Sequence, residues 1–297
     1  MPSDIPPSPV SGTTNVSEPS SRARPAATYR NAPLGVFDSG LGGLTVARAL
    51  RERLPAESIV YLGDTARVPY GTRSADTVVK YALGCARVLI DRGVKAIVVA
   101  CNTVSAVALD VLRVELDLPV LGVIEPGARA AVAASAGNVI GVLGTTGTIA
   151  SGAYLHAVAA VSTRAEVIGQ AAPLLVPLVE EGWLEGEVPR LAVRRYLEPL
   201  LARGAEVVVL GCTHYPLLQD IIEREAAAIA GRPVLIVDSA HATAEAVATF
   251  LREREAAADG PGPGKLELLV TDLPKSFADV ARRFLGASVP PVTQIDL

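Results

Sequence analysis

The sequence predicts two pseudo-symmetric three-layer α/β domains, each with a mainly parallel sheet, facing each other across a central cleft. Short apolar, β-branched runs alternate with longer helical segments from residue 34 onwards. In each half a cysteine directly follows such a run, Cys101 in the first and Cys212 in the second. Each cysteine also lies at a similar distance after a small-residue turn, at Asp38 or Thr145. This spacing is typical of a duplicated unit.

The first half repeats a pattern of strand, small-residue turn and helix. Strands are expected where runs are apolar and β-branched, and helices end before Pro55 and at Gly93. The expected strands are 35–37, 58–62, 96–100 and 120–124, and the expected helices are 44–54, 75–92 and 104–116. A long polar loop at 63–73 separates the second strand from the second helix.

A break at Pro126-Gly127 marks the expected crossing into the second half. The expected strands there are 139–143, 207–211, 234–237 and 266–270, and the expected helices are 149–160, 188–203, 242–257 and 276–285. Residues 173–183 are expected to form a loop or short helix that carries Glu180. We therefore expect a first domain of residues 33–125 plus 237–297 and a second domain of residues 126–236.

Residues 1–32 differ from the rest of the chain. They are rich in Pro, Ser and Ala and lack apolar periodicity, so we expect a disordered tail. The tail has no apolar core of the kind that a secretory signal needs. No other stretch has the composition of a membrane span.

Composition excludes several classes of protein. The net charge of −4 gives no electrostatic basis for binding nucleic acid. The three cysteines are an odd number and do not form a disulfide framework. Reduced thiols and a cytoplasmic location are the simplest expectation.

Cys101 and Cys212 are the strongest candidates for chemistry. Both lie at the carboxyl end of an expected strand, where open α/β sheets bind their ligands. Backbone N–H groups and the dipole at the N-terminus of the following helix are expected to lower the thiol pKa. A buried, inert thiol is the commoner fate of a single cysteine, and we assign it to Cys85 in mid-helix. Two thiols in matched positions favour proton transfer at opposite faces of one carbon.

Asp38, His214 and Glu180 are candidates for assisting the thiols. Asp38 follows a strand, where it could cap a helix, bind an ammonium group or help Cys101 exchange its proton. His214 lies two residues after Cys212 and could relay a proton near neutral pH, although a lone histidine is often structural. Glu180 is the weakest of the three, because an exposed loop charge explains it equally well.

Hydroxyl and amide side chains surround the expected cleft, where the glycine turns also offer N–H groups to a carboxylate. These side chains are Ser39, Asn102, Thr103, Thr145, Thr148 and Thr213. The turn after Asp38 lacks the dinucleotide-binding glycine spacing, and residues 260–265 lack that of a phosphate loop. No zinc-ligand spacing occurs, and no lysine lies in a candidate loop for a pyridoxal cofactor. We therefore expect no metal and no cofactor.

Several short segments along the chain form a recognisable set. They are Gly35 to Val46, Gly63-Asp64-Thr65, Pro69-Tyr70-Gly71, Ala100 to Thr103, Val123 to Gly127, Leu143-Gly144-Thr145 and Leu210 to Pro216. With these segments, which span about residues 34–285 in the family's order, the chain resembles the glutamate racemases of bacterial cell-wall synthesis. Val104 departs from the family, which usually has alanine there.

The resemblance implies a cofactor-independent racemase that interconverts L- and D-glutamate. Cys101 and Cys212 would be the two bases, associated with D- and L-glutamate respectively, assisted by Asp38, His214 and Glu180. The substrate would be held by Asp38, Ser39, Pro69, Tyr70, Gly71, Asn102, Thr103, Thr145, Thr148 and Thr213. The family's habit also implies a homodimer with no membrane partner.

Three other interpretations stay open. The first is a racemase of another acidic amino acid or of a hydantoin. The second is a cysteine hydrolase using Cys212 and His214, which leaves Cys101 unexplained. The third is a non-catalytic binding protein with a hinged cleft.

Overall fold

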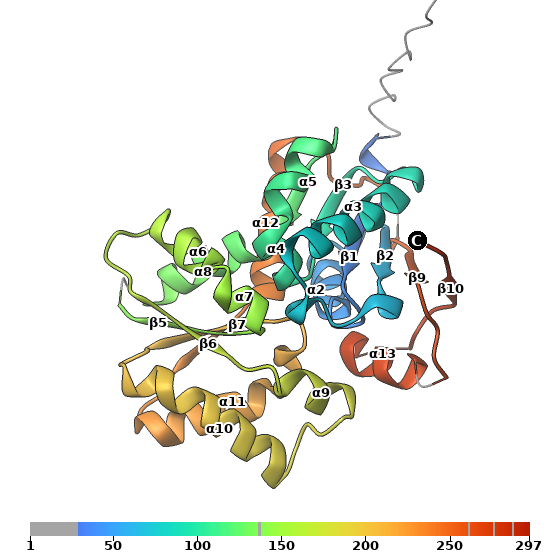
Figure 1. Cartoon of the computed structure of the whole chain (residues 1–297). Helices are drawn as coiled ribbons and strands as arrows, with labels where there is room; N and C mark the ends of the chain where they lie inside the picture. Colours follow the sequence, from blue (N-terminus) through green and yellow to red (C-terminus); the bar gives the residue numbers. More distant parts are fainter. Residues whose placement is uncertain (1–28, 136–137, 261, 276, 287) are drawn as a thin grey trace, which may run out of the picture.

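The computed structural model describes residues 29–135, 138–260, 262–275, 277–286 and 288–297. Within these ranges the strands form two sheets, and every strand pair is parallel (Figure 1). The first sheet has the order β10-β9-β2-β1-β3-β4 and the second β6-β5-β7-β8. The predicted fold class, two α/β domains with parallel sheets, is confirmed.

The elements alternate along the chain as the sequence predicts. The strands are β1 Leu34–Asp38, β2 Ile59–Gly63, β3 Ala96–Val99, β4 Val120–Gly122, β5 Ile140–Gly144, β6 Val167–Ala171, β7 Val207–Gly211, β8 Leu235–Asp238, β9 Leu266–Val270 and β10 Val292–Gln294. The helices are α2 Leu44–Arg53, α3 Ala75–Asp91, α4 Asn102–Val107, α5 Leu109–Glu115, α6 Ile124–Ser135, α7 Thr146–Ala150, α8 Ala153–Ala159, α9 Leu175–Glu180, α10 Glu187–Ala202, α11 Gln219–Ala230, α12 Ser239–Glu253 and α13 Phe277–Leu285. Two short 3-10 helices, Thr65–Arg67 and Tyr70–Thr72, lie in the predicted polar loop.

The first sheet is buried on both faces, as a parallel sheet requires. Successive β1 side chains point to opposite faces, so Val36 packs into one apolar core and Phe37 into the other. Helices α3, α4 and α5 cover the Phe37 face. Helix α2 packs beneath the opposite face and against α12. The core on the α2 side of the sheet, which contains Val36, continues without a break into the second domain.

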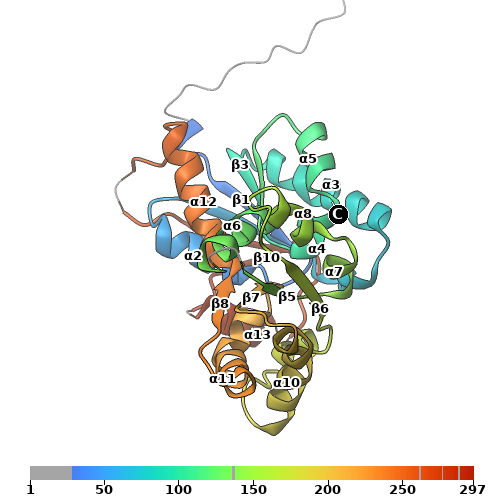
Figure 2. The ribbon, with the colours of Figure 1, turned by 90° about the vertical axis from the view of Figure 1, so that its left-hand side faces the viewer.

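The second sheet has α6 and α8 on one face and α10 and α11 on the other. Helix α12 returns the chain towards the first sheet and packs against both α2 and α6 (Figure 2). The two domains are therefore joined through a packed layer of helices.

The strand order shows that the two halves share one topology. The segment β2-β1-β3-β4 of the first sheet corresponds to β6-β5-β7-β8 of the second. Cys101 follows β3 and Cys212 follows β7, which are equivalent strands in the two halves. The duplicated arrangement inferred from spacing is thus present in the fold.

Some elements differ from expectation. Pro126-Gly127 does not break the chain but lies in the first turn of α6, where a missing N–H costs no helical hydrogen bond. Strand β6 and helix α11 were not predicted, and β6 lacks a continuous apolar run because Gly169 and Gln170 interrupt it. Strand β8 continues to Asp238, past the expected boundary at residue 237. The domain division otherwise stays a prediction.

The expected tail divides into two parts. Residues 1–28 lie outside the described residues. Residues 29–32, which we placed in the tail, are ordered against the first domain. The Tyr29 hydroxyl donates to the Lys95 carbonyl at 3.2 Å, and Lys95 Nζ donates to the Arg30 carbonyl at 2.6 Å. In the part of the chain that the structure describes, no helix has the length and apolarity needed to cross a bilayer.

Candidate active site

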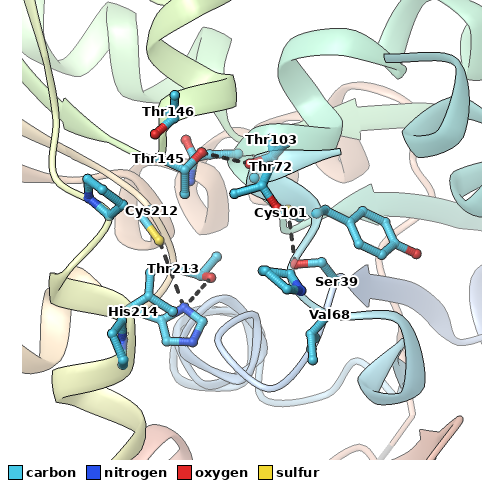
Figure 3. A pocket seen from close by; sticks show the side chains of 18 of the residues that line it. Ser39, Val68, Thr72, Cys101, Thr103, Thr145, Thr146, Cys212, Thr213 and His214 are labelled. Atoms are coloured by element: carbon cyan, nitrogen blue, oxygen red, sulfur yellow. Dashed lines mark hydrogen bonds between the residues drawn. The ribbon is translucent and has the colours of Figure 1, made fainter. Parts of the chain in front are cut away.

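A cavity of about 350 Å³ lies between the two domains at the carboxyl ends of β1, β3, β5 and β7 (Figure 3). It is lined by Ser39, Gly40, Val68, Pro69, Tyr70, Gly71, Thr72, Cys101, Asn102, Thr103, Thr145, Thr146, Pro173, Val176, Pro177, Glu180, Cys212, Thr213 and His214. Its size suits a small molecule. Cys101 and Ser39 lie on one wall, and Cys212 and His214 lie on the other.

The first wall places Cys101 next to polar groups of the β1 turn. Cys101 precedes α4, and its Sγ donates to Ser39 Oγ at 3.5 Å. Behind them Asp38 is buried, and its Oδ2 accepts from the Gly40 N–H at 3.0 Å. Oδ1 of Asp38 has no hydrogen-bond partner among the described residues. This oxygen is therefore a buried acceptor without a partner, directly behind the cavity wall.

The pKa of Cys101 differs from the sequence-based prediction. Burial, followed by the nearby Asp38 carboxylate, raises the pKa of the Cys101 thiol to about 12. We expected the following helix to lower this pKa, but α4 is short and its N–H groups do not offset the loss of water. Cys101 therefore carries its proton at neutral pH and can act as a donor. Burial also raises the pKa of Asp38, against weaker opposing effects of His214 and backbone N–H groups.

The second wall joins Cys212, His214 and Glu180 in a chain of contacts. Cys212 Sγ lies 3.8 Å from His214 Nδ1, and His214 Nε2 lies 3.0 Å from Glu180 Oε1. Burial alone lowers the pKa of His214, but its contacts with Cys212 and Glu180 outweigh burial and raise the pKa to about 10. The imidazole is therefore protonated at neutral pH and lies within reach of the Cys212 sulfur.

Three threonine hydroxyls connect the domains at the edge of the cavity. Thr103 Oγ1 lies 2.9 Å from Thr145 Oγ1 and 3.3 Å from Thr148 Oγ1. Thr145 caps α7, and its Oγ1 accepts from the Thr148 N–H at 3.2 Å. The predicted hydroxyl residues therefore meet from both halves.

The structure brings most predicted site residues together. All of them line the cavity except Asp38, which lies behind Ser39, and Thr148, which lies behind Thr145. The apolar lining from Pro173, Val176 and Pro177 was not predicted, because nothing in a short apolar helix distinguishes a cavity wall from a core. Tyr154 was not predicted either, because no local pattern marks it. Its hydroxyl donates to Asn102 Oδ1 at 2.8 Å across the domains.

Within the described ranges, no group of three or more His, Cys, Asp or Glu side chains is placed to hold a metal ion. The polar side chains on the cavity walls are thiols, hydroxyls, an amide, an imidazole and a carboxylate. Such groups can transfer protons and bind a polar ligand.

Comparison with known proteins identifies the family. The family model described as Asp/Glu/Hydantoin racemase matches residues 43–247. The chain belongs to this racemase family. A glutamate racemase from Geobacter metallireducens is 47% identical over 264 residues, which cover 89% of this chain and 96% of that relative.

Solved structures of racemases in this family have the same fold. A glutamate racemase from Bacillus anthracis has a TM-score of 0.85 at 39% identity, covering 90% of this chain and 98% of its own. A glutamate racemase from Francisella tularensis in complex with D-glutamate has a TM-score of 0.82 at 35% identity, with the same coverage.

The pKa of His214 predicts how stability depends on pH. The folded pKa of about 10 exceeds the ordinary value of 6.5, so the folded state holds this proton more tightly than the unfolded state. The resulting stabilisation is complete below about pH 6.5 and is lost as pH rises through about 10. We expect His214→Asn to flatten this fall in the free energy of unfolding, measured by urea denaturation across that window. An equal fall in both proteins would contradict the assignment.

Proposed function

We propose that this chain interconverts L-glutamate and D-glutamate without a cofactor, using Cys101 and Cys212 as its two bases. The observation that carries the proposal is the presence of two thiols on opposite walls of one cavity, each with its own polar neighbours. The racemases named above, one of them in complex with D-glutamate, support glutamate as the substrate. A cytoplasmic homodimer that supplies D-glutamate for peptidoglycan is part of the proposal.

The reaction balances with one proton removed and one returned. For L-glutamate, the Cys212 thiolate removes the α-proton, the Cα–H bond breaks, and its electron pair remains on Cα. The Cys101 thiol then donates its proton to the opposite face of Cα and becomes the thiolate. The reverse direction uses the same steps with the thiols exchanged. His214 would exchange a proton with Cys212, to which it lies close.

The polar groups on the cavity walls would hold the substrate. The free Oδ1 of Asp38 can accept from the ammonium group if the ligand approaches past Ser39. The hydroxyls of Thr103, Thr145 and Thr213 can donate to carboxylate oxygens. Asn102 Nδ2 is buried and has no partner among the described residues, so it can donate to the negative charge that develops in the transition state.

The decisive experiment is incubation of the purified protein with L-glutamate in heavy water, with no cofactor added. We expect optical rotation to decay to zero while deuterium enters at Cα. Absence of both changes, with glutamate still unaltered, would overturn the proposal and direct the same assay to aspartate and hydantoins. Binding of glutamate without exchange would instead favour a non-catalytic hinged protein.

A cysteine hydrolase is the second candidate, because the Cys212–His214–Glu180 chain resembles a nucleophile, a base and an orienting carboxylate. This alternative gives Cys101 no role. The heavy-water assay distinguishes the two, since a hydrolase leaves the α-proton of glutamate in place.

A glycine in the β1 turn predicts a strong effect on activity. A methyl group on Gly42 would lie 2.3 Å from Thr213 Oγ1 and 2.5 Å from His214 Nδ1. We therefore expect Gly42→Ala to displace the imidazole and lower the rate of racemisation about 10- to 100-fold. Gly84→Ala is the matched control, because a Cβ there meets no atom within 4 Å. Equal rates for the two variants would contradict the prediction.

A further inference from the structure

We propose that helix α13 is a positioning element for the proton-transfer pair of the opposite domain. In this inference Phe284 fixes the imidazole of His214, and Arg283 fixes the end of α9 that carries Glu180. Neither residue lines the cavity. The inference rests on the proposed racemase function and assigns α13 to one of the two thiols only, Cys212.

The first contact is between two rings. The Phe284 and His214 ring centroids lie 5.2 Å apart, with an interplanar angle of 83°. Phe284 is fully buried. This edge-to-face arrangement restricts rotation of the imidazole about its Cβ–Cγ bond, because turning the ring would lose the contact. The plane of the imidazole in turn determines whether Nδ1 faces Cys212 and Nε2 faces Glu180 at the same time.

The second contact is a hydrogen bond from α13 to the backbone of Glu180. Arg283 Nη1 donates to the Glu180 carbonyl oxygen at 2.5 Å. The guanidinium also lies against Gly182, where an added methyl group would be 2.7 Å from Arg283 Cζ. Gly182 has φ +77°, which favours glycine. The Glu180 side chain is 48% exposed, so burial does little to fix it and its position depends on the backbone that Arg283 holds.

Helix α13 is anchored in the first domain. It packs against α2, and Phe277 and Ala281 on the same helix are buried. Both contacts of α13 with Glu180 and His214 therefore cross from the first domain to the second. Cys101, by contrast, has polar neighbours from its own domain, Ser39 and Asp38. Weakening the α13 contacts should impair proton transfer at Cys212 and leave Cys101 unaffected.

Isotope effects test this one-sided role. Phe284→Leu removes the aromatic edge and keeps an apolar side chain, and Arg283→Ala removes the donor. We expect the primary isotope effect to rise with α-deuterated L-glutamate, because removal of its proton by Cys212 becomes slower. With α-deuterated D-glutamate the primary isotope effect should fall. In this direction Cys212 donates the second proton, and once that step is slower, removal of the α-proton by Cys101 limits the rate less. Isotope effects do not depend on the fraction of active protein, so partial unfolding cannot produce this pattern.

The helix offers matched controls. Phe277→Leu makes the same change at a buried phenylalanine of α13, and Arg282→Ala removes an arginine that pairs with Asp279 at 3.1 Å. We expect both controls to keep the isotope effects of the parent chain. Arg283→Lys retains a donor and should recover part of the loss. Parent-like isotope effects in Phe284→Leu and Arg283→Ala would overturn the proposal.

Alkylation tests the positioning role without substrate. Iodoacetamide labelling of each thiol, followed by peptide mass spectrometry, uses Cys101 as an internal reference within the same molecule. We expect Phe284→Leu to slow labelling of Cys212 relative to Cys101 about 2- to 10-fold, the effect of losing one edge-to-face ring contact. An unchanged ratio would overturn the positioning role even if glutamate is racemised. A changed ratio in a chain that exchanges no glutamate proton would reject the proposed function alone.

Discussion

Replacement of either Cys101 or Cys212 by alanine is expected to reduce racemisation of glutamate at least about 10³-fold, because each removes one of the two groups that transfer the proton. The measurement is the loss of optical rotation with each enantiomer. Each variant should still exchange the α-proton of one enantiomer for deuterium without inverting it, since one thiol remains. Cys101→Ala should do so with L-glutamate, and Cys212→Ala with D-glutamate.

Cys85 provides the control for these variants. It is fully buried in α3, where burial, followed by the charge of Asp64, raises its thiol pKa to about 12. Cys85→Ala should therefore alter stability but not the stereochemical course of the reaction. Inversion by either active-site alanine variant at the parent's rate would show that one thiol suffices and would reject the two-base mechanism.

Replacement of Lys95 by methionine is expected to lower the free energy of unfolding by about 3–5 kcal/mol, because it leaves a buried carboxylate without its partner. Lys95 Nζ lies 2.6 Å from Glu57 Oε2 and donates to the Ala256 carbonyl at 2.8 Å. Neither side chain is more than 2% exposed. Urea denaturation followed by circular dichroism gives the change directly.

Two further variants separate loss of the ion pair from loss of packing. The double variant Lys95→Met with Glu57→Gln should recover part of the stability, because no unpaired charge is then buried. Arg53→Met removes an exposed ion pair with Glu245 and should cost less than about 1 kcal/mol. A cost for Lys95→Met as small as that for Arg53→Met would contradict the assigned role of the buried pair.

The positions of the site residues followed from local sequence, because parallel strands deliver whatever succeeds them to one edge of a sheet. Cys101, Cys212 and Thr145 each lie within two residues of the end of a strand, so their convergence could be predicted. The pKa of Cys101 could not, since it depends on burial and on the packed position of Asp38. The helix that follows Cys101 in the sequence does not reveal how far the fold shields the thiol from water, and this shielding is the main cause of its raised pKa.

Contacts between distant segments were beyond the reach of sequence patterns. Phe284 and Arg283 read as ordinary residues of an amphipathic helix, and only the fold places them beside His214 and Glu180. Lys95 likewise reads as an exposed charge before a strand, yet the backbone carbonyls of Arg30 and of Ala256, just after α12, accept hydrogen bonds from it in the core. Such pairings depend on how the domains pack rather than on periodicity along the chain.

The two thiols have unlike neighbours, a carboxylate on one wall and an imidazole on the other. Mirror-image substrates nevertheless have equal free energies in water, so the equilibrium constant of the proposed reaction is unity. The ratio of kcat/KM for the two enantiomers is therefore also unity, whatever the walls contain. Their asymmetry can make kcat and KM differ between the two enantiomers, but only by the same factor. A net supply of one enantiomer then depends on a later reaction that consumes it selectively.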